Sequence, residues 1–230
     1  MRELAKMYGV TDTEAVAAVA AAAQEPNGIG WWAPYKNDIT QDYLDFITLE
    51  SEADRICVWH PLLVTGLLQS PAYAREIISS ASVDTSTAEK IDRVVTIRMG
   101  RQEVLSRSGK AAAVQALIPE GAFAQKFAGG PSVMREQLTR LRDLSQSPNA
   151  DIRVVPADVL PHPGLGAGFT ILKFPHPWPS VVSVDHRRGG SVLGEQGDLD
   201  EYEATFTKIT DVALSTDKSR DLITHHLERL

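Results

Sequence analysis

Residues 129–185 limit the possible folds of this chain more than any other stretch of its sequence. The stretch begins with two glycines and Pro131, and proline suits the first turn of a helix because an N–H there has no partner within the helix. Apolar side chains then recur at helical spacing, at Met134, Leu138, Leu141 and Leu144. The stretch therefore opens with an amphipathic helix.

Three short runs with the composition of strands follow this helix. They are residues 152–155 (IRVV), 169–174 (FTILKF) and 181–185 (VVSVD). A Pro-Trp-Pro turn separates the second run from the third, which predicts a hairpin. Both hairpin runs are apolar on both faces, so we expect helices to cover at least part of the sheet on each side. The sequence thus predicts an α+β fold, with a mixed sheet of about four to six strands covered by helices.

The segments on either side supply further helices and one more strand. Apolar residues at helical spacing predict helices over residues 42–58, 72–79, 87–107 and 198–213. Asp198 is expected to cap the last of these, with Glu201 completing a capping box, and another helix begins at Thr216 or Asp217. Residues 112–118 predict a strand, and residues 82–86 a loop.

The chain divides into three parts. Residues 1–27 hold two helical segments, the second rich in alanine, and are expected to be an N-terminal helical remnant. Residues 28–41 form a linker in which Trp31 and Trp32 either anchor the chain on the main body or mark a docking site. Residues 42–230 form the main domain, which is long enough to bury a core of its own.

Composition excludes several classes of protein. The net charge of −7 argues against a broad positive surface for nucleic acid, so this chain alone should bind DNA poorly. The single cysteine, Cys57, excludes an internal disulfide. No apolar run approaches the ~18 residues of a membrane span, and the start shows no signal region. We therefore expect a cytoplasmic protein that does not associate with membranes.

No motif for a cofactor or a metal ion is recognised. The glycine-rich residues 164–168 precede a strand instead of joining a strand to a helix, so they are read as a flexible loop and not as a dinucleotide fingerprint. Cys57, placed on an apolar helical face, is expected to be a buried, inert thiol. The six histidines lack zinc-site spacing, so neither a metal nor a cofactor is expected; they are His60, His162, His176, His186, His225 and His226.

Polar residues on otherwise apolar elements form the candidate site. These are Glu50, Arg98, Arg101, Gln102 and Glu120, which are expected to converge at the edge of the sheet. Arginine suits a bidentate grip on a carboxylate or a phosphate, which favours a ligand pocket. The alternative is that these residues pair with one another as a buried ion network, and both can hold together. His162, in the glycine-rich loop, either contacts the ligand or is simply solvated.

From about residue 35 onward, the order of segments resembles a domain of unknown function that is common in actinobacterial regulators. The resemblance rests on residues 46–53, 56, 59, 63–70, 73–75, 98, 101–103, 120, 129–130, 133–138, 154–156, 162, 164, 168–169, 181–182 and 214–215. In that family the domain follows an XRE-type helix-turn-helix, in antitoxin-like transcriptional regulators that often lie beside a small partner protein. Residues 4–10 and the next helix resemble the tail of that helix-turn-helix, without its recognition helix. This chain has Thr65 where the family usually has proline, and Ser183 and Asp185 where tyrosine and glutamate are more typical.

The resemblance implies a regulatory domain that senses a small-molecule effector or a small protein partner encoded nearby. DNA would be bound only through the helix-turn-helix that this chain lacks, and a homodimer is expected from the two-fold symmetry of helix-turn-helix operators. The alternative is a cofactor-independent enzyme or a binding protein on the same domain, with Glu120 or His162 as the acid–base group.

Overall fold

A computed structural model describes residues 32–35, 37–81, 87–159, 161–186 and 189–230. Within these ranges the helices are α3 (Gln41–Glu52), α4 (Pro71–Ala81), α5 (Ala88–Arg101), α6 (Pro131–Leu144), α7 (Gln196–Val212) and α8 (Thr216–Glu228). The strands are β1 (Arg55–Trp59), β2 (Ala113–Pro119), β3 (Ala150–Val155), β4 (Phe169–Lys173), β5 (Val181–His186) and β6 (Gly189–Leu193). The predicted N-terminal helical remnant, the start of the linker and the loop at 82–86 lie outside the described residues.

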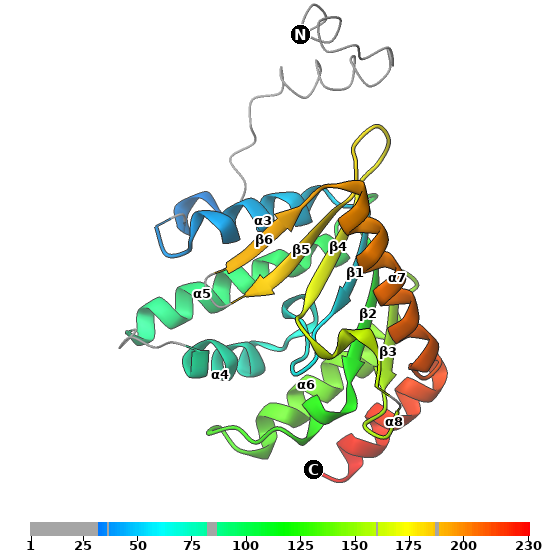
Figure 1. Cartoon of the computed structure of the whole chain (residues 1–230). Coiled ribbons are helices and arrows are strands. Elements are labelled where there is room, and N and C mark those ends of the chain that lie inside the picture. Colours follow the sequence, from blue (N-terminus) through cyan, green and yellow to red (C-terminus); the bar gives the residue numbers. More distant parts are fainter. Residues whose placement is uncertain (1–31, 36, 82–86, 160, 187–188) are drawn as a thin grey trace, which may run out of the picture.

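The strands form one six-stranded sheet in the order β3-β2-β1-β4-β5-β6 (Figure 1). On one side of β1 lie the parallel neighbours β2 and β3, reached through α4 with α5 and then through α6. On the other side β4, β5 and β6 run as an antiparallel meander. The predicted α+β fold with a mixed sheet is confirmed, including the hairpin of β4 and β5.

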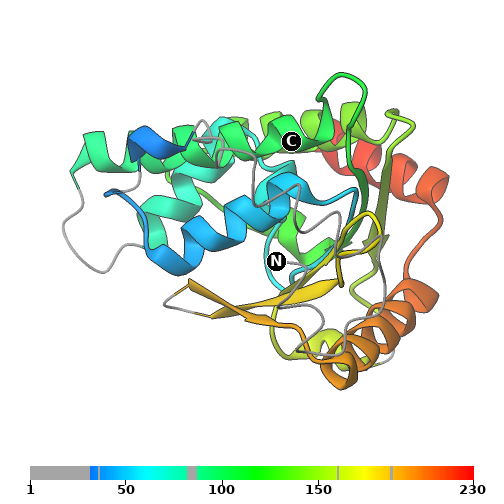
Figure 2. The same ribbon diagram turned by 90° about the horizontal axis from the view of Figure 1, so that it is seen from above.

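Helices cover the two faces of the sheet unequally (Figure 2). Along β1, Ile56 and Val58 belong to a large core with side chains of α3, α4, α6 and α8. Cys57 and Trp59 point the other way and pack with α7 through Phe206 and Ile209. The period-two alternation of one central strand therefore divides the interior into a large core and a smaller one.

Local sequence explains where several helices begin. Pro131 occupies the first turn of α6, and Gly130 before it has a φ of 78°, a backbone conformation that favours glycine. Thr40, Thr87 and Ser215 cap α3, α5 and α8, since each side chain accepts a hydrogen bond from a backbone N–H three residues on. These caps fix the first residues of three helices, of which α3 and α5 border the site.

The structure corrects three sequence-based boundaries. The helix predicted over residues 42–58 ends at Glu52, and residues 55–59 form β1, so Cys57 lies on a strand and not on a helical face. The helix predicted to reach residue 107 ends at Arg101 and continues as the 3₁₀ helix η3 (Gln102–Leu105). Helix α7 begins before Asp198, with Glu195 in the cap position, so the predicted capping box is wrong. The helix misassigned over β1 matters most, because β1 is at the centre of the sheet.

Candidate functional site

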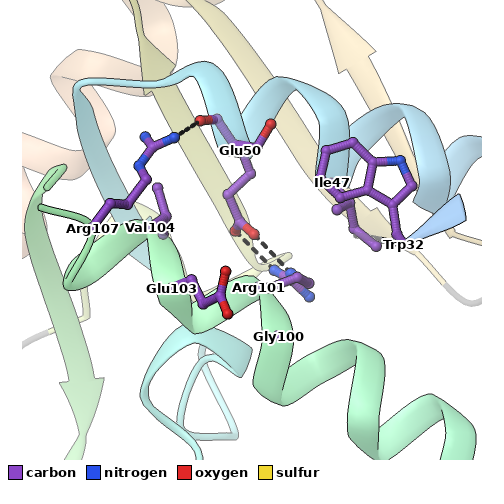
Figure 3. Close-up of a pocket in the computed structure, with 9 residues that line it drawn as sticks. Trp32, Ile47, Glu50, Gly100, Arg101, Glu103, Val104 and Arg107 are labelled. Carbon is purple, nitrogen blue, oxygen red and sulfur yellow. Dashed lines mark hydrogen bonds and ion pairs between the residues drawn. The ribbon is translucent and has the colours of Figure 1, made fainter. Parts of the chain in front are cut away.

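A buried ion pair joins α3 to α5. Arg101 donates from Nε to Glu50 Oε2 over 2.7 Å and from Nη2 to Glu50 Oε1 over 2.8 Å (Figure 3). Its Nη1 donates to the Tyr43 hydroxyl over 2.6 Å, and only 8% of the Arg101 side chain and 2% of the Glu50 side chain are exposed. Burial opposes the charge of Arg101, but Glu50 and Tyr43 raise its pKa above the ordinary value. The expected ion network is therefore confirmed for Glu50 and Arg101.

Two glutamines hold the turn beside this ion pair. Gln102 Nε2 donates to the carbonyl oxygens of Gly66 and Gln69, over 3.0 Å and 2.8 Å, and its side-chain oxygen accepts from Arg140. Gln69 donates to the carbonyl of Val64 over 2.7 Å and accepts from Arg98 Nη1 over 3.0 Å. The 3₁₀ helix η2 (Gly66–Leu68) is thus fixed against α5, with the Arg98 side chain beside it.

A cavity of about 270 Å³ opens between these helices and the sheet. We call it the sheet pocket. One wall comes from α3, α5 and the turn around Gly66, and the floor comes from β1, β4 and β5. Its lining residues are Tyr43, Phe46, Val58, His60, Leu63, Val64, Thr65, Gly66, Gln69, Ile77, Arg98, Arg101, Thr170, Ser183, Asp185 and Gly190. Such a mixture of apolar walls and a few polar groups is typical of small-molecule sites.

The floor of the sheet pocket carries two hydroxyl groups. Thr170 and Ser183 are register partners on β4 and β5, so their side chains leave the sheet on the same face as Val58. They are only 6% and 2% exposed, yet neither hydroxyl has a hydrogen-bond partner among the described residues. Buried polar groups are normally paired, so these two are positioned to meet something in the pocket.

His60 and Asp185 lie at the mouth of the sheet pocket. The Nδ1 atom of His60 accepts from the backbone N–H groups of Leu62 and Leu63, both over 3.1 Å, which assigns the proton of the neutral ring to Nε2. Burial lowers the pKa of His60, although Asp185 acts in the opposite direction, so the ring is neutral at pH 7. A Cβ on Gly168 would lie 2.8 Å from His60 Cδ2 and 3.0 Å from Asp185 Oδ2, so this arrangement requires glycine there.

The structure brings together some of the predicted site residues and separates others. Arg98 and Arg101 line the sheet pocket, while Glu50 and Gln102 lie behind its wall as hydrogen-bond partners. Glu120 does not converge with them. It lies at the end of β2, accepts from the backbone N–H of Ala157 and contacts His226 Nε2 over 3.1 Å.

His162 is also far from the arginines, on the face of the sheet covered by α7. Its ring meets Trp59 edge-on at 5.5 Å, and its Nδ1 accepts from the backbone N–H of Gly164. Trp59 Nε1 donates to the Gly164 carbonyl over 2.7 Å, and Gly164 is buried. The glycine-rich loop is therefore packed at this point, and the reading of Gly164 as part of a flexible loop is wrong.

Sequence reasoning missed several polar residues of the sheet pocket, among them His60, Thr170, Ser183 and Asp185. A signal for two of them was present, because Ser183 and Asp185 alternate with valine along β5 and so share one face. No pattern in the neighbouring sequence indicated that His60 or Thr170 would line a pocket. Their importance comes from the pairing of β1 with β4 and of β4 with β5.

A smaller cavity of about 210 Å³ lies on the other side of the ion pair (Figure 3). Trp32, Ile47, Glu50, Arg101 and Arg107 are among its lining residues. Arg101 lines both cavities, so the ion pair forms a partition between the sheet pocket and the region next to the linker.

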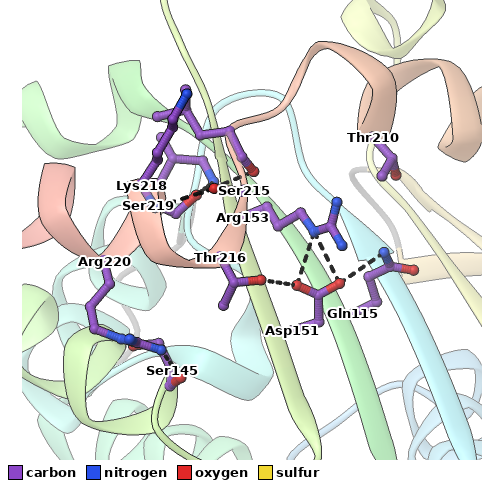
Figure 4. Close-up of polar contacts among 12 residues, drawn as sticks. Gln115, Ser145, Asp151, Arg153, Thr210, Ser215, Thr216, Lys218, Ser219 and Arg220 are labelled. Carbon is purple, nitrogen blue, oxygen red and sulfur yellow. Dashed lines mark hydrogen bonds and ion pairs between the residues drawn. The ribbon is translucent and has the colours of Figure 1, made fainter.

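A second polar cluster, around Asp151 on β3, has a structural role (Figure 4). Asp151 accepts from Arg153, from the Thr216 hydroxyl over 2.7 Å and from Gln115 over 3.1 Å. Its carboxylate is thus occupied by protein donors. Across the described residues, no group of three or more histidine, cysteine, aspartate or glutamate side chains is arranged to hold a metal ion. In the same ranges, no helix has the length and apolar character needed to cross a bilayer.

Comparison with known proteins assigns the chain to a family. Neither the curated proteins nor the solved structures that were compared with the chain give a match. A family model described as "Domain of unknown function (DUF5753)" matches residues 43–225, which include most of α3, every described element from β1 to α7 and most of α8. This chain belongs to the DUF5753 family.

Proposed function

We propose that this chain is the sensing domain of an XRE-type, antitoxin-like transcriptional regulator, and that a small-molecule effector binds in the sheet pocket. One observation carries the proposal: the pocket is lined by the buried Nε of Arg98 and by the hydroxyls of Thr170 and Ser183, for which the described residues provide no hydrogen-bond partner. A cavity that existed only through imperfect packing would be apolar, since unpaired polar groups in it cost stability. The regulator class rests on the sequence resemblance and is an analogy.

The walls of the pocket give an effector a route to the N-terminal side of the chain. Tyr43 and Phe46 line the pocket from α3, and α3 follows directly on the linker. The linker is also tied to α5, because Arg93 Nε donates to Asp38 Oδ1 over 2.9 Å. A ligand that shifts α3 relative to α5 therefore changes how the linker is held. Such a shift would reach a DNA-binding module placed before it.

The proposal favours a small molecule over the small protein partner that the resemblance also implies. The unpaired groups line a pocket of about 270 Å³, a space that suits a small molecule and not a folded protein. Binding of a protein encoded nearby, and assembly into a homodimer, remain predictions.

Operator binding tests the proposed function. A helix-turn-helix placed before this chain should bind its operator with an affinity that a metabolite fraction changes by about tenfold or more, corresponding to a typical allosteric coupling. Fluorescence anisotropy with labelled operator DNA measures this change. Thr170→Leu, which fills the pocket floor, should abolish the response, whereas Thr207→Leu on the exposed face of α7 should retain it.

Two results would refute the proposed function. The first is operator affinity that neither metabolites nor the product of the neighbouring gene alters. The second is steady turnover of a small molecule in the sheet pocket without any effect on operator binding, which would make the domain an enzyme.

A further inference from the structure

We infer that the ligand of the sheet pocket is a small anion, a metabolite whose carboxylate or phosphoryl group binds Arg98 and the hydroxyls of Thr170 and Ser183. The inference rests on the proposed function in one respect, namely that the sheet pocket is the effector site. It goes further by naming the chemical class of the effector and the residues that select it.

Arg98 and Arg101 differ in how the protein uses their guanidinium groups. They lie one helical turn apart on α5 and both line the pocket. Arg101 donates from all three of its nitrogens, to the Glu50 carboxylate and the Tyr43 hydroxyl, so its charge is neutralised. Among the described residues, Arg98 has only a neutral partner, the side-chain oxygen of Gln69, and its buried Nε has no hydrogen-bond partner.

The half-buried charge of Arg98 is therefore uncompensated. An arginine side chain does not lose its proton in a protein, so the positive charge persists in the pocket. Within the described residues no carboxylate forms an ion pair with Arg98. A cation without a partner beside a cavity favours an anion in that cavity, because a charge-assisted hydrogen bond there replaces lost hydration.

The floor of the pocket offers donors suited to the same anion. The unpaired hydroxyls of Thr170 and Ser183 sit side by side on β4 and β5 and can each donate to an oxygen of the ligand. The neutral His60 adds an N–H donor at Nε2 near the mouth. Asp185, the one carboxylate among the lining residues, is exposed at the mouth, where water screens its charge.

The size of the pocket limits the ligand. Its volume of about 270 Å³ lies just below the range of about 300–1,000 Å³ for small-molecule sites. A single small metabolite fits this space, whereas a folded protein or a nucleic-acid duplex does not enter it. The ligand is therefore small as well as anionic.

Titration of this chain with two anions tests the inference. The probes are inorganic phosphate and succinate, which separate the phosphoryl from the carboxylate source, with sodium chloride at matched ionic strength as reference. Thermal shift and calorimetry should show saturable binding of at least one probe beyond chloride. Arg98→Gln should weaken that binding by about tenfold or more, as expected for the loss of a charge-assisted hydrogen bond.

Matched variants keep the test decisive if Arg98→Gln folds poorly. Thr170→Val removes an unpaired hydroxyl at nearly constant volume, so it should weaken anion binding about threefold or more without lowering the melting temperature of the unliganded protein. Arg135→Gln, which removes the same charge from an exposed position on α6, should leave binding unchanged.

The inference is overturned if neither anion binds beyond chloride, or if Arg98→Gln and Thr170→Val both bind the anion as well as the wild type. Its failure is distinct from failure of the proposed function. If only an uncharged or cationic compound alters operator binding, the ligand class is wrong and the sensing role stands. If an anion binds through Arg98 but does not change the affinity for the operator, the ligand class stands and the regulatory role is wrong.

Discussion

Single residues decide which charged side chains of this domain are paired within the protein and which remain available to a ligand. Arg101 and Arg98 occur in the same helix, and the residue that separates their roles is Glu50 on α3. Because Glu50 grips Arg101 with both oxygens, that arginine is part of the scaffold. Arg98, whose one side-chain partner in the described part of the chain is Gln69, remains available to a ligand.

We predict that Glu50→Gln destabilises the fold by about 3–5 kcal/mol, because it leaves the buried charge of Arg101 without its carboxylate. Urea denaturation gives the free energy of unfolding. Glu52→Gln on the same helix is the matched control, since that side chain is 67% exposed and lies 4.0 Å from Lys110, so its loss should cost less than about 1 kcal/mol. An equal loss of unfolding free energy in the two variants would show that the buried ion pair stabilises the fold no more than the exposed one.

Among the elements, β3 shows how an edge strand of this sheet is protected. It has β2 on one side only, and the turn between α7 and α8 covers part of its other edge. Leu214 N–H donates to the Val154 carbonyl over 2.8 Å, and Val154 N–H donates to Ser219 Oγ over 2.8 Å. Backbone groups that would otherwise pair with another chain are thereby occupied.

Ser219→Ala should destabilise the protein by about 1–3 kcal/mol, because it leaves the buried Val154 N–H without an acceptor. Urea denaturation measures this loss, and faster hydrogen exchange of the Val154 amide would place it at the edge of β3. Ser80→Ala provides the control, since Ser80 is exposed and donates only to a carbonyl of its own helix. An unchanged exchange rate at Val154 would contradict the proposed role of Ser219.

At the scale of the whole molecule, two carboxylates fasten α8 to the rest of the domain. Asp151 accepts from Thr216 at the start of α8, and Glu120 contacts His226 near its end (Figure 4 shows the first contact). Burial would raise the pKa of each carboxyl, but hydrogen bonds outweigh it. Those from His226 and the Ala157 N–H lower the pKa of Glu120, and those from Arg153, Thr216 and Gln115 lower the pKa of Asp151.

These two lowered pKa values predict that the fold loses stability in acid. A carboxyl whose pKa is lower in the folded than in the unfolded state stabilises the fold above its ordinary value of about 4, and this contribution is lost as the pH falls through the folded-state pKa. The urea midpoint should therefore drop between about pH 5 and about pH 3. The drop should be shallower in a Glu120→Gln, Asp151→Asn double variant, and parallel curves would rule out these two groups as its source.

Where local pattern and local chemistry agreed, the fold followed from the sequence. The helix at Pro131, the strand ending at Val155 and the hairpin of β4 and β5 were predicted from caps, breakers and periodicity. In the site, Arg98 and Arg101 were recognised as polar positions on a long helix whose guanidinium groups suit a carboxylate or a phosphate, and both line the sheet pocket. The sensing role, the ligand class and the dimer remain predictions.

The sequence by itself determined the mixed sheet with its helices and singled out Arg98 and Arg101 on α5, because turn residues and side-chain periodicity act over a few neighbouring positions. Only the tertiary structure decided that residues 55–59 form the central strand, since their hydrogen bonds go to β2 and β4, far along the chain. It also decided that Glu50 neutralises Arg101, and that the hydroxyls of Thr170 and Ser183 line the same pocket as Arg98. Those contacts join residues about fifty or more positions apart, and no local pattern encodes a distance of that kind.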